Sequence, residues 1–173
     1  MRRYFSVILV TACLMLPCVA QADMLFAFEF NGGQSSASGI LTAMSNGDGS
    51  FTAIAGHGTY TSPTYTDEAI SLFPNPNAPG FALSHYFAYD NQLLPSGAPG
   101  GLLDVYGLLF QLLGGTVELN IFDAGSVYVS IERAPSRTDT GTFTLTAVPE
   151  PSTILLMGSI LLGVVGALKR RLV

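Results

Sequence analysis

Residues 39–55 read GILTAMSNGDGSFTAIA, and this stretch contains the clearest β-hairpin signal in the chain. Asn46-Gly47 and Asp48-Gly49 are two successive residue pairs that accept the positive backbone φ of a tight hairpin turn. The segments on either side, 39–45 and 50–55, have the length and composition of short strands. We therefore predict an antiparallel hairpin here and extend the same interpretation along the chain in both directions.

Short strands are predicted on both sides of this hairpin. Before it, Phe26, Phe28 and Phe30 alternate with less apolar residues, a period of two that indicates a half-buried strand. Residues 102–113 fit either a short helix or a buried strand, and the glycines at 107, 114 and 115 favour the strand. Loops rich in Pro and Gly are expected at 74–80 and 90–101. The remaining strands are predicted at 58–62, 69–73, 81–89, 116–122, 126–132 and 142–148.

Without the uncertain segment 102–113, these predictions give nine short strands, together with abundant glycine and no convincing helix between the two ends of the chain. In the segment 126–132, Val127, Val129 and Ile131 are expected on one side of the strand and Tyr128, Ser130 and Glu132 on the other. The fold class that follows is all-β, with an antiparallel β-sandwich or a flattened barrel as its architecture.

The last residues of the chain have a three-part organisation: Pro149-Glu150-Pro151, an uncharged apolar segment at 153–168, and the basic residues Lys169, Arg170 and Arg171. Each proline fixes its own φ and pushes the preceding residue toward extended geometry. A helix over 153–168 would reach roughly 24 Å, close to a hydrocarbon core of about 30 Å. We interpret it as a transmembrane helix rather than a buried core helix, because no polar stripe interrupts it. The positive-inside rule then keeps the basic residues cytoplasmic.

Residues 148–171 resemble the PEP-CTERM sorting tail of bacterial proteins, on the Pro149-Glu150-Pro151 box, the apolar helix and the basic stop. The resemblance implies processing near that box by exosortase, a membrane transpeptidase. It also implies an inner-membrane-anchored intermediate and final delivery to the cell surface or extracellular matrix of a Gram-negative-type bacterium. Systems of this kind accompany exopolysaccharide and biofilm, so exopolysaccharide is a candidate partner. The middle of the chain resembles, more loosely, the Gly- and Thr-rich β passengers of such tails.

The N-terminus has the organisation of an export signal. A basic Met1-Arg2-Arg3 precedes an apolar segment at 4–16, and Ala20-Gln21-Ala22 fits the small-x-small rule for cleavage after Ala22. The general secretion machinery is therefore an expected partner. A twin-arginine signal and a lipoprotein box ending at Cys13 are the alternatives, and both fit less well. The predicted domains are a signal peptide at 1–22, a passenger domain at 23–147 and the sorting tail at 148–171.

The passenger domain is strongly acidic. It contains two basic residues, Arg133 and Arg137, against eleven acidic ones, which gives a net charge of −9, and it contains no cysteine or lysine. Such a surface repels nucleic acid and anionic lipid, so no nucleic-acid partner is expected. Without disulfides, its stability depends on core packing.

The passenger offers little recognisable chemistry. His57 and His85 are its two histidines, and Asp90 or Asp104 could complete a triad with a serine, but no nucleophile elbow is present. Asn46, Asp48 and Ser50 alternate as calcium ligands could, without the glutamate or loop length of an EF-hand. We expect no catalytic residues, no metal and no cofactor, and we predict that the protein is not an enzyme.

The predicted role is structural or adhesive, at the cell surface or in the matrix. The main alternative is a carbohydrate-binding module, because flat aromatic rings lie close to polar residues in the sequence. A tail-anchored hydrolase is a more distant alternative. The aromatic candidates for carbohydrate binding are Tyr60, Tyr65, Phe81, Tyr86, Phe87, Tyr89 and Tyr106.

Overall fold

The computed structural model describes residues 23–96, 101–133 and 136–149. These residues form eleven strands and one short 3-10 turn, η1, at Leu113–Gly115. The strands are β1 (Met24–Gly32), β2 (Ser36–Ser45), β3 (Phe51–Thr61), β4 (Glu68–Leu72), β5 (Ala82–Leu83), β6 (Ala88–Tyr89), β7 (Gln92–Leu93), β8 (Leu108–Leu112), β9 (Val117–Asp123), β10 (Tyr128–Arg133) and β11 (Arg137–Val148).

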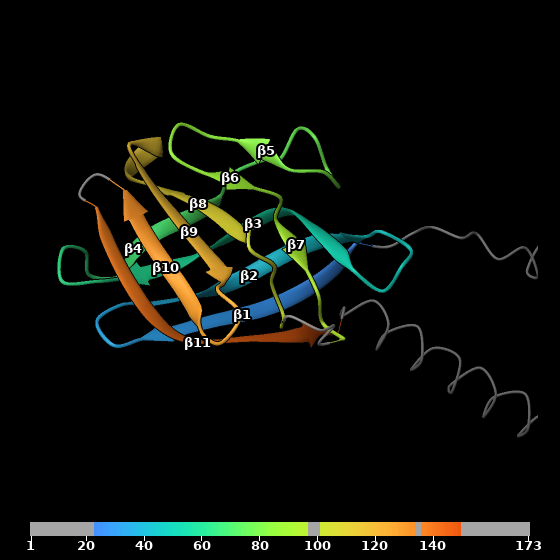
Figure 1. Cartoon of the computed structure of the whole chain (residues 1–173), viewed down its shortest axis with the longest axis horizontal. Helices are drawn as coiled ribbons and strands as arrows, with labels where there is room; N and C mark the ends of the chain where they lie inside the picture. The colour runs from blue at the N-terminus through green and yellow to red at the C-terminus, as the bar shows by residue number, and fades with distance from the viewer. Residues whose placement is uncertain (1–22, 97–100, 134–135, 150–173) are drawn as a thin grey trace, which may run out of the picture.

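Eight of these strands close into a barrel (Figure 1). Their order is β2-β1-β11-β10-β9-β8-β4-β3, and a pairing between β2 and β3 closes the ring. Every pairing is antiparallel. β7 pairs with the first residues of β3 outside the ring, and β5 with β6 form a separate two-stranded flap. The all-β prediction is confirmed, and the closed barrel is the architecture that the chain adopts.

The barrel interior is built on the phenylalanines of β1. Phe26, Phe28 and Phe30 are each at most 3 % exposed, as the period-two alternation predicts. Phe28 stacks against Phe110 of β8 and Phe143 of β11, with ring centroids 5.2 and 6.3 Å apart. Aromatic contacts therefore join opposite walls of the barrel, in agreement with a core that relies on packing alone.

The predicted hairpin at 39–55 is confirmed. The Asn46 amide donates to the Ser50 carbonyl at 3.0 Å, and Gly47 and Gly49 adopt φ values of 85° and 91°. Beyond the turn the pairing register shifts by one residue, so that Ile54 has no partner in β2. This β-bulge increases the local twist, which helps a strand curve into a barrel.

The prediction of two strands at 50–55 and 58–62 is wrong, because β3 runs through both without a break. The break that these two ranges imply at 56–57 does not occur. Instead, Gly58 lies opposite Gly39 of β2, where an added Cβ would collide with the Ser38 carbonyl oxygen. Glycine is needed at position 58 because β2 and β3 approach each other closely there, and not because the chain turns.

The prediction of one strand at 81–89 is also wrong. Only Ala82–Leu83 and Ala88–Tyr89 are strands, and the four residues between them form the turn of the flap. The flap covers the outer face of β8, where Ala82 and Tyr89 pack on Leu109. The segment 102–113 becomes a strand only from Leu108, and the predicted loop at 90–101 contains β7.

Candidate functional site

Most of the predicted sorting and processing residues lie outside the described residues. These are Ala20, Ala22, Glu150, Pro151, Lys169, Arg170 and Arg171, together with the signal peptide at 1–22 and the helix at 153–168. Pro149 is described; it is exposed and directly follows β11. Within the described ranges, no helix has the length and apolar character needed to cross a membrane.

Both ends of the barrel chain leave from the same pole. Leu25 pairs with Val148, so the start of β1 and the end of β11 are neighbours, and both lie on the right-hand side of the barrel in Figure 1. Met24 also pairs with Ala43, which places the 46–50 turn at this pole. The β1–β2 turn at 33–35 lies at the opposite pole, beside Asp139 of β11. We call the first the terminal pole and the second the distal pole.

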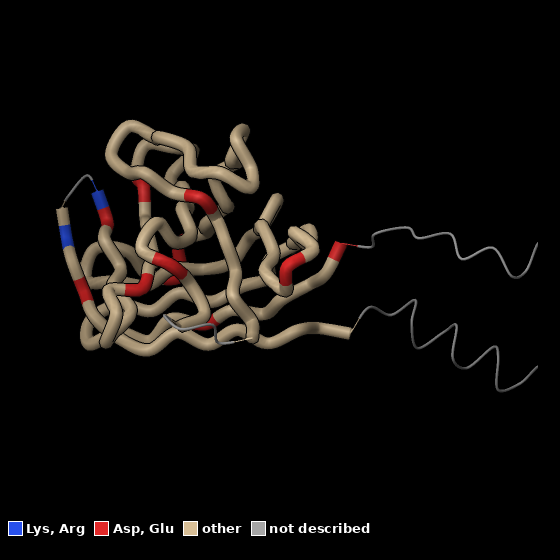
Figure 2. Tube along the Cα trace, turned by 45° about the vertical axis from the view of Figure 1, so that its right-hand side comes forward, with Lys and Arg blue, Asp and Glu red and all other residues tan. Residues whose placement is uncertain are grey.

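Charge is distributed unevenly between the poles (Figure 2). The two basic residues of the passenger, Arg133 and Arg137, flank the β10–β11 connection at the distal pole. Asp23 and Asp48 lie toward the terminal pole, from which the chain continues into the sorting residues. The two described arginines therefore lie at the distal pole, and the described charged residues near the terminal pole are acidic.

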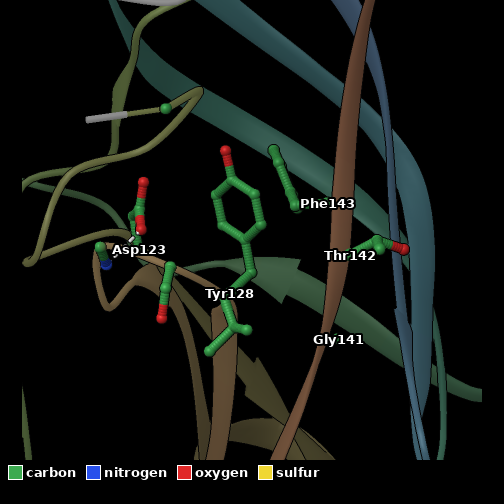
Figure 3. Close-up of a pocket in the computed structure, with 9 residues that line it drawn as sticks. Asp123, Tyr128, Gly141, Thr142 and Phe143 are labelled. Atoms are coloured by element: carbon green, nitrogen blue, oxygen red, sulfur yellow. Dashed lines mark hydrogen bonds between the residues drawn. The ribbon is translucent and has the colours of Figure 1, made fainter. Parts of the chain in front are cut away.

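A cavity of about 490 Å³ lies where β10 begins and β11 continues past it (Figure 3). Tyr128 stands in it between Asp123 and Phe143, and its ring centroid is 5.4 Å from that of Phe143. The Tyr128 hydroxyl accepts a hydrogen bond from the Leu102 amide at 2.8 Å, and Asp123 Oδ1 accepts one from the Gly125 amide at 2.6 Å. Gly101, with φ of 109°, leaves room for both polar groups.

The polar groups of this cavity are largely used by the protein itself. Its described lining includes one carboxylate and one phenol and no histidine, lysine, arginine or cysteine. Asp123 and Tyr128 hold neighbouring backbone amides in place, and the other polar side chains of the lining are the hydroxyls of Ser126 and Thr142. This arrangement positions loops and does not supply a nucleophile with an adjacent base.

Glu132 lies inside the distal end of the barrel and is 1 % exposed. Its Oε2 accepts hydrogen bonds from Tyr60 Oη at 3.1 Å and Ser62 Oγ at 3.2 Å, while Oε1 has no partner among the described residues. Burial, followed by the nearby Glu132 carboxylate, raises the pKa of Tyr60 to about 12. The predicted alternation of β10 is confirmed, but its polar side faces the interior rather than the solvent.

Asp90 and Asp104 meet in the loops beside β7. Asp90 is 6 % exposed, and its Oδ1 accepts the Gln92 amide at 2.9 Å. Burial, and after it the nearby Asp104 carboxylate, raise the pKa of Asp90 to about 7. Asp104 Oδ1 in turn accepts the Tyr106 and Gly107 amides, each at 2.9 Å. The two carboxyls thus lie near each other while each accepts backbone amides of its own loop.

The two histidines lie on different elements. His57 is exposed on the outer face of β3, and His85 is exposed in the flap turn, with its ring edge against Tyr86. Neither imidazole forms a hydrogen bond to a described serine or aspartate. The hydrolase alternative therefore gains no support from their positions.

The oxygen atoms of the 46–50 turn bond to one another. Asp48 Oδ1 accepts from the Ser50 hydroxyl at 2.6 Å and the Ser50 amide at 2.8 Å, and Asn46 Nδ2 donates to Ser50 Oγ at 2.9 Å. The Ser50 hydroxyl and then its amide hold the pKa of Asp48 below its usual value. Turn formation accounts for the alternating polar residues. No cluster of three or more metal-ligating His, Cys, Asp or Glu side chains occurs in the described ranges.

The aromatic candidates for carbohydrate binding differ in their exposure to solvent. Tyr60 and Tyr89 are each 1 % exposed and belong to the barrel and to the flap contact. Phe81 and Tyr106 are 53 % and 37 % exposed and stack on each other at 5.5 Å with an interplanar angle of 10°. Tyr86 is exposed, Tyr65 packs against the core, and Phe87 lies under Arg133.

Three buried acids were not identified as candidates from the sequence: Asp123, which lines the cavity described above, Glu118 and Glu132. Glu118 of β9 is 7 % exposed because the flap turn covers it, and Ser84 Oγ donates to it at 2.6 Å. Glu132 is covered by the barrel itself. The alternation of β10 groups Glu132 with Tyr128 and Ser130 but does not indicate that this polar side faces the interior. Glu118 had no local signal either, because its cover is 34 residues away in the sequence.

Comparisons with known proteins identify the C-terminal residues. Residues 147–171 match the model of the PEP-CTERM protein-sorting motif. No curated protein and no solved structure matches the chain. The match overlaps the last residues of β11 and covers all the sorting residues predicted above. The chain therefore carries a PEP-CTERM protein-sorting motif, which implies an exported, membrane-associated protein that is processed by an exosortase.

Proposed function

We propose that this protein is a structural or adhesive component of the cell surface or extracellular matrix, linked to exopolysaccharide, with no catalytic activity of its own. The observation that carries the proposal is the sorting motif, which begins within the last barrel strand. The last barrel strand, β11, ends at Val148, and Pro149 follows it directly at the terminal pole. The barrel is therefore joined to its sorting residues without an intervening linker.

The test is to determine the C-terminal residue of the mature protein by mass spectrometry. In cells with an active exosortase we expect a chain that ends near Pro149-Glu150-Pro151, and in cells without it the intact chain in the inner membrane. Changing Pro149 and Pro151 to Ala should also leave unprocessed protein, because the extended peptide before the apolar segment is lost. Recovery of a chain that still ends at Val173 from cells with an active exosortase would refute the proposal.

A second candidate function is carbohydrate recognition by the flap. It is favoured by the exposed Phe81–Tyr106 stack, since flat aromatic faces pack against the apolar faces of sugars. The released protein should then bind polysaccharide in a pull-down assay. Phe81→Ala with Tyr106→Ala should weaken that binding, whereas Met44→Ala, which removes an exposed apolar side chain from β2, serves as the control.

A further inference from the structure

The outer face of β11, β1, β2 and β3 carries two straight rows of polar side chains. Strand register brings four residues into each row, one from each strand in that order. The first row is Thr142, Asn31, Ser36 and Thr61, and the second is Thr144, Glu29, Ser38 and Thr59. We call these eight residues the hydroxyl face, since six of them carry a hydroxyl group. Seven are exposed and Thr61 is partly exposed.

The hydroxyl face is hollowed rather than uniformly convex. A depression of about 160 Å³ lies between the β1, β2 and β3 members of both rows, and Asp67, from the β3–β4 connection, closes one side. This volume has room for one sugar ring of a longer chain rather than for a whole oligosaccharide. Its lining is almost entirely polar, with Ala37 as the apolar member.

Part of the depression is already ordered by internal hydrogen bonds. Asn31 Nδ2 donates to Glu29 Oε1 at 2.9 Å, and Thr61 Oγ1 donates to Asp67 Oδ1 at 3.1 Å. The Asp67 amide also donates to Thr61 Oγ1 at 3.1 Å. Both carboxylates are thus held in position with a second oxygen uncommitted, so little side-chain entropy would be lost when a ligand binds.

Three hydroxyls in the depression are also uncommitted. Ser36, Ser38 and Thr59 line it, and their side chains form no hydrogen bond to any residue of the described ranges. A hydroxyl both donates and accepts, and a carboxylate accepts two or more hydrogen bonds. A ligand that matches this set must itself carry many groups that donate and accept, at short and regular intervals.

Charge restricts the ligand further. The depression contains two carboxylates and no basic residue, and both arginines of the passenger lie on the β10–β11 connection. A sulfated, phosphorylated or uronate-rich chain would bring like charges together, which is destabilising. A neutral polyol matches the hydrogen-bonding groups without that cost.

The spacing of the rows fits a polymer. Neighbouring strands lie about 4.8 Å apart, close to the length of one sugar residue in an extended chain. A polysaccharide lying across the strands would therefore meet a new polar side chain at each residue. From these observations we propose that the hydroxyl face binds a neutral polysaccharide chain, with one sugar ring in the depression between Glu29, Ser38, Thr59 and Asp67. This proposal rests on the proposed extracellular role and names the ligand class.

The experiment measures binding of the intact chain, solubilised in mild detergent, and of the released protein. The probes are cellulose, chitin, dextran and galactomannan, with alginate as the anionic contrast. We expect binding to at least one neutral probe, weak or no binding to alginate, and no change on addition of EDTA. Ser38→Ala with Thr59→Val should weaken binding by roughly tenfold, because two hydrogen bonds are lost while strand shape is preserved.

Thr138→Val is the matched control. It makes the same change on the outer face of β11 but lies outside both rows, so binding should be unchanged. Glu29→Gln with Asp67→Asn keeps the shape of the depression and should relieve the discrimination against alginate.

Several results would overturn the proposal. These are unchanged binding in the Ser38/Thr59 variant, equal binding to alginate, loss of binding in EDTA, or no binding to any neutral probe. Loss of binding only in the Phe81/Tyr106 variant would move the site to the flap. None of these results affects the mass of the mature C-terminus, so failure of the hydroxyl face is distinguishable from failure of the sorting role.

Discussion

Asp90 shows how one carboxyl can couple this fold to pH. Its pKa is raised to about 7 by burial and by Asp104, against 3.8 in the unfolded chain. The folded protein therefore keeps a proton that the unfolded chain has lost between about pH 4 and pH 7. The stability that this proton provides is complete below pH 4 and is lost as the pH rises through 7.

We predict that the free energy of unfolding falls by roughly 2–3 kcal/mol between pH 5 and pH 8 because of this group. Asp90→Asn should remove most of that fall, since an amide resembles the protonated acid and still accepts the Gln92 amide. Urea unfolding at both pH values measures the effect, with Asp23→Asn as an exposed control. An equally steep fall in the Asp90 variant would show that another group causes the pH dependence.

At the level of elements, long-range contacts to Glu118 and Arg133 hold the turn of the flap. Glu118 of β9 accepts hydrogen bonds from Ser84 Oγ at 2.6 Å and from the Tyr86 amide at 3.3 Å, and Arg133 lies 6.0 Å from the centre of the Phe87 ring. β5 and β6 have two residues each, too few to hold a hairpin closed alone. The flap is therefore expected to open more easily than any barrel strand.

We predict that Glu118→Gln speeds amide hydrogen exchange in residues 84–88 on the order of 10- to 100-fold, because charge-assisted hydrogen bonds to the turn are lost. Exchange in β1 and β11 should stay as it is. Mass spectrometry of exchanged peptides gives both values, and Glu68→Gln on β4 is the control. If the barrel strands exchanged faster as well, Glu118 would be stabilising the whole fold rather than the flap.

The same elements show what the sequence can and cannot predict. The hairpin at 39–55 was predictable because Asn46-Gly47 and Asp48-Gly49 act within a few residues of the strands they join. The flap was not predictable, since Glu118 and Ser84 are 34 residues apart. The break predicted just before Gly58 was wrong for a related reason: the need for a glycine at this position comes from Gly39 on another strand.

Closure of the barrel is a property of the whole molecule rather than of any single strand or turn. A sandwich and a flattened barrel have the same strands, and they differ only in which edges meet. Here the deciding pairings join β1 to β11 and β2 to β3. The first joins residues that are more than a hundred positions apart, and no local pattern specifies it. The sorting residues were predictable because a signal that a processing enzyme reads must be local.

The common exit of both chain ends predicts the orientation of the anchored intermediate. The terminal pole should lie next to the membrane and the distal pole away from it. The passenger contains no cysteine, so single cysteines can report this. We predict that Met44→Cys, 44 % exposed beside the 46–50 turn, reacts several-fold more slowly with a membrane-impermeant thiol reagent before processing than after it. Gln34→Cys, in the β1–β2 turn, should react at the same rate before and after processing. Slower reaction of Gln34→Cys before processing would show instead that the distal pole lies next to the membrane.

The pairing of β1 with β11 also determines how the protein would withstand mechanical force. If the C-terminal end is tethered to the envelope and the hydroxyl face adheres to matrix, tension runs lengthwise along β11. The eight residue pairs between β1 and β11 then share the load in shear. Tension applied between the two chain ends would instead open the same pairs one at a time, beginning at Leu25 and Val148. We therefore expect the fold to resist tension between its C-terminal end and the hydroxyl face better than it resists tension between its two chain ends.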